Sequence, residues 1–326
     1  MSQEPEMSLQ QAITRFLARM KRKSASEHTI RNYSKALAAF SNSLARRKID
    51  PRRTPVQALS PDWLSYFLDD LSTSAVSTER VYTTIVAGFY RYVAAEEWAE
   101  INLARLNLRL QERRSPGRRL PRAPAREIEA IIATSKALLA EKLSFTERLI
   151  VLRDHAFLTT LADTGLRLAE ACNLRRGDMD WADRRARVRG KGGREDIVRF
   201  SARAVDCLQQ YLSARQVLDE QQSSSLEKLP LFARHDRRAG RRILPISPRT
   251  GEQIVARAVA RALGEKAQGQ VTPHDFRRCF VTNLMRATGD IHLAQRAARH
   301  ASIYTTVRYS RLDDAELDEI YDEVFG

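Results

Sequence analysis

Residues 109–122 divide this chain into two parts. The stretch RLQERRSPGRRLPR contains six arginines, two prolines and one glycine in fourteen residues, and its apolar residues have no helical period. Proline and glycine interrupt helices and strands, so this composition predicts a linker. At 326 residues the chain is long enough for two domains that each bury their own core. We therefore expect a first domain over residues 1–110, a linker over 111–123 and a second domain over 124–312.

Basic residues outnumber acidic ones, at 55 Lys and Arg against 40 Asp and Glu, for a formal net charge of +15. Most of the basic residues are arginines, whose planar guanidinium binds two phosphate oxygens at once. A nucleic-acid partner is the leading interpretation, and a ribosomal protein or a merely solubilising basic surface is the alternative. Four linker arginines are candidate DNA contacts, unless the linker is simply solvated: Arg113, Arg114, Arg118 and Arg119.

The first domain is predicted to be helical. Ser26 can cap one helix, Ser60 followed by Pro61 can begin another, and Ser77 can open a third. Apolar side chains recur at steps of three and four in this last segment, at Tyr82, Ile85, Phe89 and Tyr92.

The second domain mixes helices with a few strands. Residues 184–188 and 197–200 alternate as two short strands around a Gly-Lys-Gly-Gly sequence at 190–193, which is typical of a hairpin. Residues 229–232 are a candidate third strand, and Ser201 is the expected cap of a further helix. Other helices are expected at residues 124–140, 145–163, 166–174, 249–264 and 273–286.

The cysteines and the N-terminus exclude several other classes. Cys172, Cys207 and Cys279 have no CxxC spacing, and no histidine has a ligand-like partner, so we expect reduced thiols and no metal site. The start MSQEPEM lacks the basic and apolar regions of a leader, and no apolar run approaches the ~18 residues of a membrane span. A cytoplasmic protein without a membrane partner is expected.

A set of residues in the second domain suggests phosphoryl transfer to a phenol. Arg167 stands in TGLRLAEACNL, and the sequence VTPHDFRR places His274 and Arg277 three residues apart, on one face of a helix. Attack on a phosphodiester needs fixed cations for the non-bridging oxygens and a proton for the leaving oxygen. A tyrosine, Tyr309, follows His300 by nine residues.

These residues, in this order and spacing, resemble the signature of the tyrosine recombinases, the phage integrase family. The match comprises the T-G-x-R-x-x-E-x-x-x-L box, a lysine in a glycine hairpin, H-x-x-R, a late histidine and a tyrosine. The resemblance implies a mainly α fold with a small β-hairpin or sheet. It also implies that a helical core-binding domain and an α+β catalytic domain form a C-shaped clamp around double-stranded DNA.

The resemblance assigns two arginines and a tyrosine to the phosphate. Arg167 and Arg277 would clamp its non-bridging oxygens, and Tyr309 would be the nucleophile. Glu170, one helical turn after Arg167, would orient that arginine or its helix.

Three further residues receive supporting roles from the resemblance. Lys191 would protonate the leaving 5′ oxygen, His274 would bond the phosphate or accept a proton, and His300 would hold an oxygen or pack behind the tyrosine. The sequence departs from the family at Arg278, usually a histidine, and at Arg299, usually a glycine that permits a tight turn.

The implied activity is site-specific recombination through a 3′-phosphotyrosine, without metal, ATP or another cofactor. The implied partners are DNA with inverted half-sites and three further copies of the chain, as a homo-tetramer or a dimer of dimers. The alternatives are an activity like that of a type IB topoisomerase or telomere resolvase, and a DNA-binding regulator that has lost catalysis. The acidic residues 313–326 show helical apolar spacing and are expected to pack on their own domain or dock on a neighbouring protomer.

Overall fold

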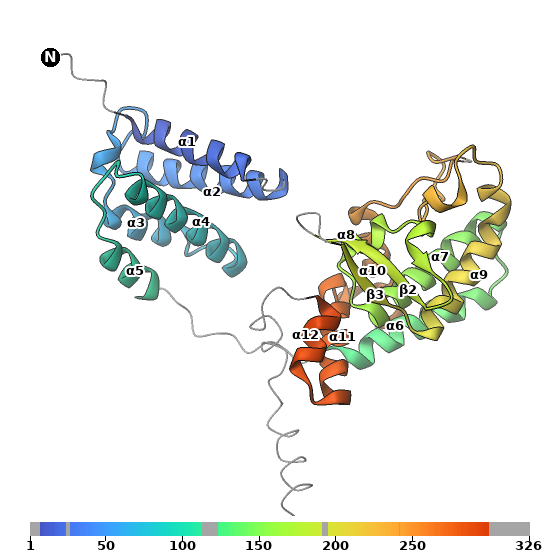
Figure 1. The fold of residues 1–326 in the computed structure, drawn as a ribbon. Helices are drawn as coiled ribbons and strands as arrows, with labels where there is room; N and C mark the ends of the chain where they lie inside the picture. Colours follow the sequence, from blue (N-terminus) through green and yellow to red (C-terminus); the bar gives the residue numbers. More distant parts are fainter. Residues whose placement is uncertain (1–6, 24–26, 113–122, 191–194, 241, 300–326) are drawn as a thin grey trace, which may run out of the picture. The chain divides into compact units, whose positions relative to one another are not determined.

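Figure 1 shows the chain in a computed structural model, which describes residues 7–23, 27–112, 123–190, 195–240 and 242–299. The chain divides into two compact units, Met1–Arg118 and Arg119–Gly326. Helices predominate in both units and the second also contains a small sheet, so the predicted fold class is confirmed.

The N-terminal unit is helical throughout its described residues. Its helices are α1 (Leu9–Arg22), α2 (Glu27–Arg46), the 3-10 turn η1 (Val56–Ala58), α3 (Pro61–Leu71), α4 (Val76–Ala95) and α5 (Leu103–Glu112). As predicted, Ser60 caps α3, accepting a hydrogen bond from the backbone of Asp62, and Pro61 is the first helical residue. Helix α4 begins one residue before Ser77, and its N-cap Ala75 makes no side-chain hydrogen bond. The expected cap Ser26 lies outside the described residues.

Aromatic side chains fill the core of this unit. The rings of Phe40 and Phe67 meet edge to face with centroids 5.5 Å apart, and Phe16 contacts Phe89 at 5.6 Å. Tyr90 is fully buried, but its hydroxyl donates a 2.8 Å hydrogen bond to the carbonyl of Ser60, so no polar atom is stranded there. The unit thus has a core of its own.

The C-terminal unit has helices around a small sheet. Its helices are α6 (Ala125–Ala137), α7 (Phe145–Thr164), α8 (Leu168–Asn173), α9 (Ala202–Asp219), α10 (Pro248–Leu263), α11 (Pro273–Thr288) and α12 (Ile291–Ala298), with 3-10 turns η2 (Leu138–Ala140), η3 (Arg176–Asp178), η4 (Leu226–Lys228) and η5 (Glu265–Ala267). Ser144 and Glu147 form a capping box that begins α7, and Ser201 caps α9 as predicted.

The sheet is antiparallel in the order β1-β2-β3, with strands Met179–Asp180, Arg185–Arg189 and Glu195–Arg199. The predicted hairpin is present as β2 and β3, with Ala186 opposite Val198. The prediction of a third strand at residues 229–232 is wrong, because β1 takes that place. Pro230 has no N–H to donate to a ladder, and the segment makes only an isolated bridge with Arg175.

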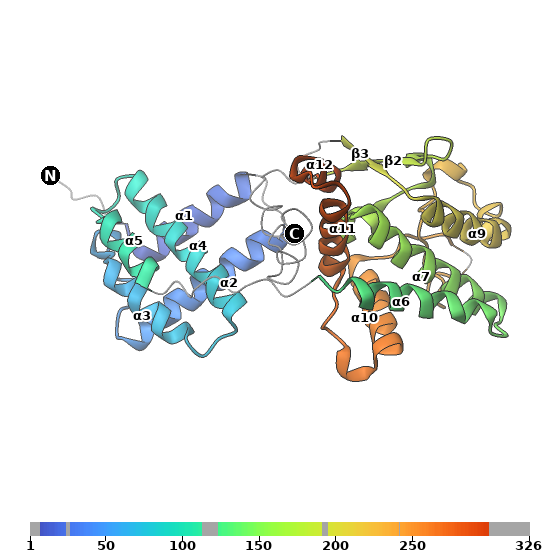
Figure 2. The same ribbon diagram turned by 90° about the horizontal axis from the view of Figure 1, so that it is seen from below.

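Helix α12 is an element that the apolar pattern did not predict. Asp290 caps it by accepting hydrogen bonds from the backbone of His292 and Leu293, at 2.7 and 3.0 Å. Ala294 and Ala298 are fully buried with Val281 of α11, so small residues bring the two helices close together. Figure 2 shows α11 lying between α12 and α7, and both helices pack against it.

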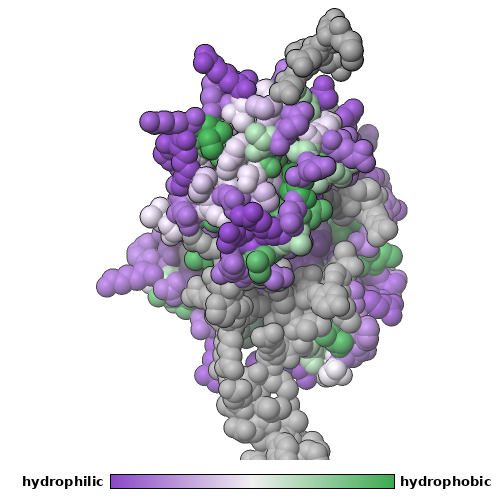
Figure 3. Space-filling model, turned by 90° about the vertical axis from the view of Figure 1, so that its left-hand side faces the viewer, coloured by the Kyte–Doolittle hydropathy of each residue, from purple (hydrophilic) through white to green (hydrophobic). Residues whose placement is uncertain are grey.

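Within the described residues, no helix combines the length and apolar character that a membrane span requires. The face drawn in Figure 3 is mainly hydrophilic, with apolar side chains in small groups between the polar ones.

Candidate active site

The turn that positions Arg167 requires a glycine for two reasons. Helix α7 ends at Thr164, and Gly165 follows it in the left-handed conformation with φ of +59°. A Cβ atom at Gly165 would lie 2.3 Å from Cδ1 of Phe280 on α11, well inside van der Waals contact. The chain therefore reverses tightly against α11, and Arg167 becomes the N-cap of α8.

Glu170 binds Arg167 through both its backbone and its side chain. Glu170 Oε2 accepts the backbone N–H of Arg167 at 3.0 Å, and Oε1 accepts from its Nη1 at 2.7 Å. The Arg167 side chain is 50% exposed, whereas that of Glu170 is 8% exposed. A buried carboxylate thus holds a guanidinium that solvent and a ligand can reach.

Arg277 ties two segments of the site together. Its side chain is buried, and Nη1 donates a 2.6 Å hydrogen bond to the carbonyl of Gly165, while Nη2 donates to the carbonyl of Ala298. These carbonyls lie two residues before Arg167 and one before Arg299. The structure therefore brings Arg277, expected as a phosphate clamp, to the turn that carries Arg167.

His274 lies one helical turn before Arg277 on α11 and is exposed. Partial desolvation of the ring and the charges of Arg277 and Arg278 hold its pKa below the ordinary value, against the opposing charge of Asp275. The imidazole is therefore neutral near pH 7 and can accept a proton.

Arg278, one of the two departures from the family pattern, is half of an ion pair within α11. Its Nη1 lies 3.2 Å from Oδ1 of Asp275. The other oxygen of Asp275 accepts the backbone N–H and the hydroxyl of Thr272 at 2.8 and 2.7 Å, which caps the helix. Arg278 thus contacts the carboxylate that starts the helix carrying His274 and Arg277.

Arg299, the second departure, keeps the backbone geometry that a glycine would favour. It follows α12 in the left-handed conformation, with φ of +56° and ψ of +45°. Its side chain is 6% exposed, and its Nη2 donates to Oε2 of Glu170 at 2.5 Å. The sequence pattern did not identify this residue as part of the site, because its partner is 129 positions away.

Seven of the predicted functional residues, and the acidic segment 313–326, lie outside the described residues. They are Arg113, Arg114, Arg118, Arg119, Lys191, His300 and Tyr309. Strand β2 ends at Arg189 and β3 begins at Glu195, so the paired strands flank the segment that contains Lys191.

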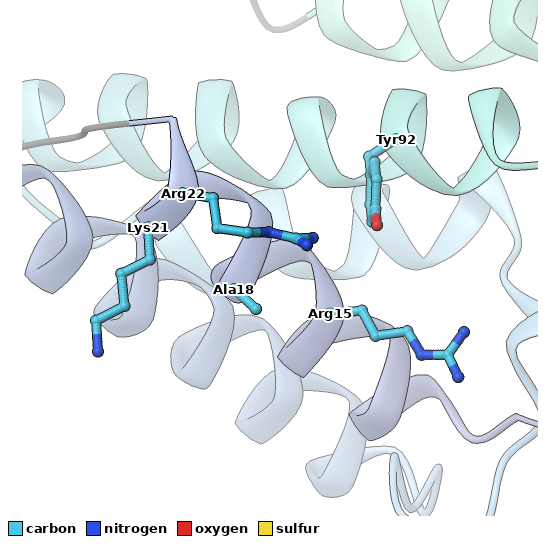
Figure 4. A pocket seen from close by; sticks show the side chains of 5 residues that line it. All are labelled: Arg15, Ala18, Lys21, Arg22 and Tyr92. Carbon is cyan, nitrogen blue, oxygen red and sulfur yellow. The ribbon is translucent and has the colours of Figure 1, made fainter.

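The N-terminal unit contains a basic pocket that sequence reasoning did not predict. It measures about 730 Å³ and is lined by Arg15, Ala18, Lys21 and Arg22 of α1 and by Tyr92 of α4 (Figure 4). The helical spacing of Arg15 and Arg22, seven residues apart, was the available signal. Three of the five lining residues are basic, which makes the pocket a candidate contact for phosphate.

The family model for the phage integrase family matches residues 122–316. Tyrosine recombinase XerC of Thermodesulfovibrio yellowstonii is 29% identical to the chain over 314 residues, covering 95% of both proteins. Tyrosine recombinase XerD of Mycobacterium tuberculosis is 28% identical over 303 residues, covering 90% of both.

Solved structures of tyrosine recombinases share the fold of this chain, and two of them illustrate the similarity. One is the XerH site-specific recombinase bound to its palindromic difH substrate after cleavage, with a TM-score of 0.68, 19% identity, and coverage of 96% of this chain and 83% of that one. The other is a lambda integrase dimer bound to a core site, with a TM-score of 0.60, 18% identity, and coverage of 94% and 98%.

Proposed function

Because the chain belongs to the phage integrase family and is a tyrosine recombinase, we propose that it cleaves and rejoins DNA at specific sites through Tyr309. The observation that carries this proposal is the joining of Arg167, Glu170 and Arg277 at one turn between α7, α8 and α11. An exposed guanidinium is held there by a buried carboxylate, and His274 lies one helical turn before Arg277 on α11.

In the proposed reaction, the phenol oxygen of Tyr309 attacks the phosphorus of the scissile phosphodiester. A 3′-phosphotyrosine bond forms as the bond to the 5′ oxygen breaks. Arg167 stabilises the charge that develops on the non-bridging oxygens, and Arg277 is the second arginine assigned to this charge. The neutral ring of His274 is suited to accept the phenol proton.

The leaving 5′ oxygen needs a proton, and we assign its delivery to Lys191. The antiparallel strands β2 and β3 provide a base for the segment that carries this lysine. His300 would hold a non-bridging oxygen or pack behind Tyr309. Rejoining reverses the same steps with a different 5′ hydroxyl, so the phosphotyrosine conserves the bond energy and the side chains supply the cations and protons.

The proposed substrate is DNA with inverted half-sites, bound by a homo-tetramer or a dimer of dimers. The XerH recombinase of the same fold is bound to a palindromic substrate, which supports the inverted repeat. Residues 1–110 would act as the core-binding domain, joined by the linker 111–123 to the catalytic domain 124–312, and the basic pocket on α1 offers one phosphate contact. The acidic residues 313–326 would dock on a neighbouring protomer, since negative charge disfavours contact with DNA.

The test is a covalent-adduct assay on a nicked suicide substrate that carries the protein's own recombination site. Tyr309→Phe should abolish the adduct, because only the nucleophilic oxygen is lost, and should leave the affinity for DNA nearly unchanged. Tyr304→Phe is the matched control and should still form the adduct. An adduct that persists in Tyr309→Phe would place the nucleophile elsewhere.

The same substrates separate the alternatives. If the protein is a DNA-binding regulator, the chain without substitutions should bind the site but form no covalent adduct. A topoisomerase-like enzyme would relax supercoiled DNA that lacks recombination sites. A recombinase would instead exchange strands between two DNA molecules or segments that each carry a recombination site.

A further inference from the structure

One carboxylate in this site is shared by two guanidinium groups. Glu170 Oε1 accepts from Arg167 at 2.7 Å, and Oε2 accepts from Arg299 at 2.5 Å. The two arginines differ in exposure, since the Arg167 side chain is 50% exposed and that of Arg299 is 6% exposed. A ligand can therefore reach Arg167, whereas the side chain of Arg299 is buried.

The backbone conformation at position 299 does not favour an arginine. Its φ of +56° lies in the left-handed region, which glycine adopts readily and residues with a Cβ adopt with strain. The turn itself is held from elsewhere, because Arg277 donates to the carbonyl of Ala298. A glycine would serve the turn, so the contribution particular to Arg299 is its side chain.

The side chain of Arg299 adds one positive charge to the pair of Arg167 and Glu170, and the negative charge of Asp196 also acts on it. With Arg167 alone, Glu170 and its partner would be neutral together; with Arg299 the group is a net cation. The charge of Arg299 also contributes to a pKa of Glu170 below its usual value, although burial of this carboxyl acts to raise it. Glu170 therefore remains ionised, and Arg299 remains its buried counter-charge.

A phosphate that draws Arg167 away from Glu170 would leave a carboxylate that is 8% exposed. Without a second cation this separation would be strongly opposed, because a buried charge would lose its partner. With Arg299 in place the carboxylate keeps an ion pair throughout. Nε and Nη1 of Arg299 also have no hydrogen-bond partner among the described residues, so the Glu170 contact is the one that orients it.

We propose that Arg299 is a positioning residue, which neutralises Glu170 and thereby frees Arg167 to bind the scissile phosphate. This inference rests on the proposed function of Arg167. It assigns Arg299 a role that a glycine at this position could not perform.

The first experiment measures the rate of adduct formation on the nicked substrate. Arg299→Gly removes the cation and suits the backbone, and should slow the reaction by about ten- to a hundredfold, the range for loss of one charged hydrogen bond. Affinity for a half-site in a gel-shift assay should change by less than about threefold, because many other contacts bind the DNA. Arg299→Lys, which keeps the charge, should recover much of the rate.

The decisive variant is the double substitution Glu170→Gln with Arg299→Gly. A neutral amide cannot hold the Arg167 guanidinium by charge, but its oxygen can still accept the backbone N–H of Arg167. Adding Glu170→Gln should therefore restore most of the rate that Arg299→Gly loses. Arg296→Gln is the matched control, because it removes an exposed cation from the same helix α12 without touching Glu170, and it should react normally. A rate for Arg299→Gly within about threefold of the natural chain would overturn the proposal, as would failure of both the lysine and the double variant to recover.

A second measurement does not depend on catalysis. Phenylglyoxal modifies arginines that are free of ion pairs, and peptide mass spectrometry can report its reaction at Arg167. Labelling of Arg167 should be lower in Arg299→Gly, because Glu170 then holds Arg167 alone, and unchanged or higher labelling would contradict the proposal. If the natural chain forms no adduct but this difference is present, the proposed function fails, and what stands is that Arg299 weakens the hold of Glu170 on Arg167.

Discussion

Two residues beside the site, Gly165 and Arg299, have left-handed backbones for different physical reasons. At Gly165 the space that a side chain would need is occupied by Phe280, at 2.3 Å from an ideal Cβ. At Arg299 the side chain has room and reaches Glu170. The first position thus excludes every side chain, whereas the second tolerates backbone strain in exchange for an ion pair.

The comparison with Gly289 predicts how much of the Gly165 requirement is steric. Gly289 also has a positive φ, of +64°, but an added Cβ would meet nothing within 4 Å. Gly289→Ala should therefore lower the free energy of unfolding by about 1–2 kcal/mol, the strain of the left-handed backbone. Gly165→Ala should cause the same loss of unfolding free energy and a further loss of about 1–3 kcal/mol from overpacking against Phe280. It should also impair DNA cleavage, because it displaces Arg167. Urea denaturation of both variants tests this, and equal losses would show that Phe280 moves aside without penalty.

At the scale of elements, helix α9 is fixed by a buried polar network. Arg215 is fully buried, with Nε 2.9 Å from Oδ1 of Asp219, and it donates to the hydroxyl of Tyr211 at 3.1 Å. That hydroxyl also accepts the backbone N–H of Ala233 at 3.2 Å, so its own hydrogen points to Nε2 of His235, 2.8 Å away. His235 must then be neutral, and burial with the charges of Arg153 and Arg215 lowers its pKa to about 3.

This network predicts that the C-terminal unit loses stability in mild acid. An unfolded histidine titrates near pH 6.5, so above that pH both states are neutral and His235 has no effect. Below it the unfolded chain binds a proton that the folded chain refuses, down to about pH 3, and stability falls by about 1.4 kcal/mol per pH unit. Burial also lowers the pKa of His155, which adds to the same trend.

The variant that isolates this effect is His235→Gln, because a glutamine oxygen can still accept the Tyr211 hydrogen but does not titrate. Trp181 is the single tryptophan in residues 119–326. Urea unfolding at pH 7 and pH 5, followed by its fluorescence in a chain whose Trp63 and Trp98 are replaced by phenylalanine, gives the measurement. The free energy of unfolding should depend less steeply on pH in the variant, by the amount that corresponds to about one proton taken up on unfolding. An identical slope in both proteins would mean that His235 is protonated in the folded state.

At the scale of the whole molecule, one third of the net positive charge lies in the fourteen residues where the two units are joined. Many arginines of the units are already paired, as Arg203 is with Glu129 and Asp163. The linker stretch at residues 109–122 contains six arginines and one acid, so most of its charge has no neighbour in sequence to neutralise it. We expect these residues to contribute to DNA affinity without contributing to sequence specificity.

Replacing Arg113, Arg114, Arg118 and Arg119 by glutamine should weaken binding to any duplex, whether or not it contains the recombination site. Each lost phosphate contact should reduce the slope of log affinity against log salt concentration by about 0.9. Fluorescence anisotropy with a specific and a random duplex at several salt concentrations measures both slopes. If neither slope changes, the linker is a solvated spacer.

The sequence by itself determined the family and where most helices lie. A helix that buries one face repeats its apolar side chains every three or four residues, and a glycine hairpin between alternating strands is equally local. The order and spacing of Arg167, Glu170, His274 and Arg277 likewise identify the family without any knowledge of contacts. All these signals lie within short stretches of chain.

Only the tertiary structure decided which strand completes the sheet and how the site is held together. Residues 229–232 are apolar enough for a strand, but Pro230 lacks the donor and β1 pairs with β2 instead. Arg277 reaches a carbonyl 112 residues away, and Arg299 reaches Glu170 across 129 residues. Such contacts depend on atoms meeting within about 3 Å after α11 packs on α7 and α12 packs on α11. No periodicity along the chain encodes that distance, because it is set by the packing of whole helices.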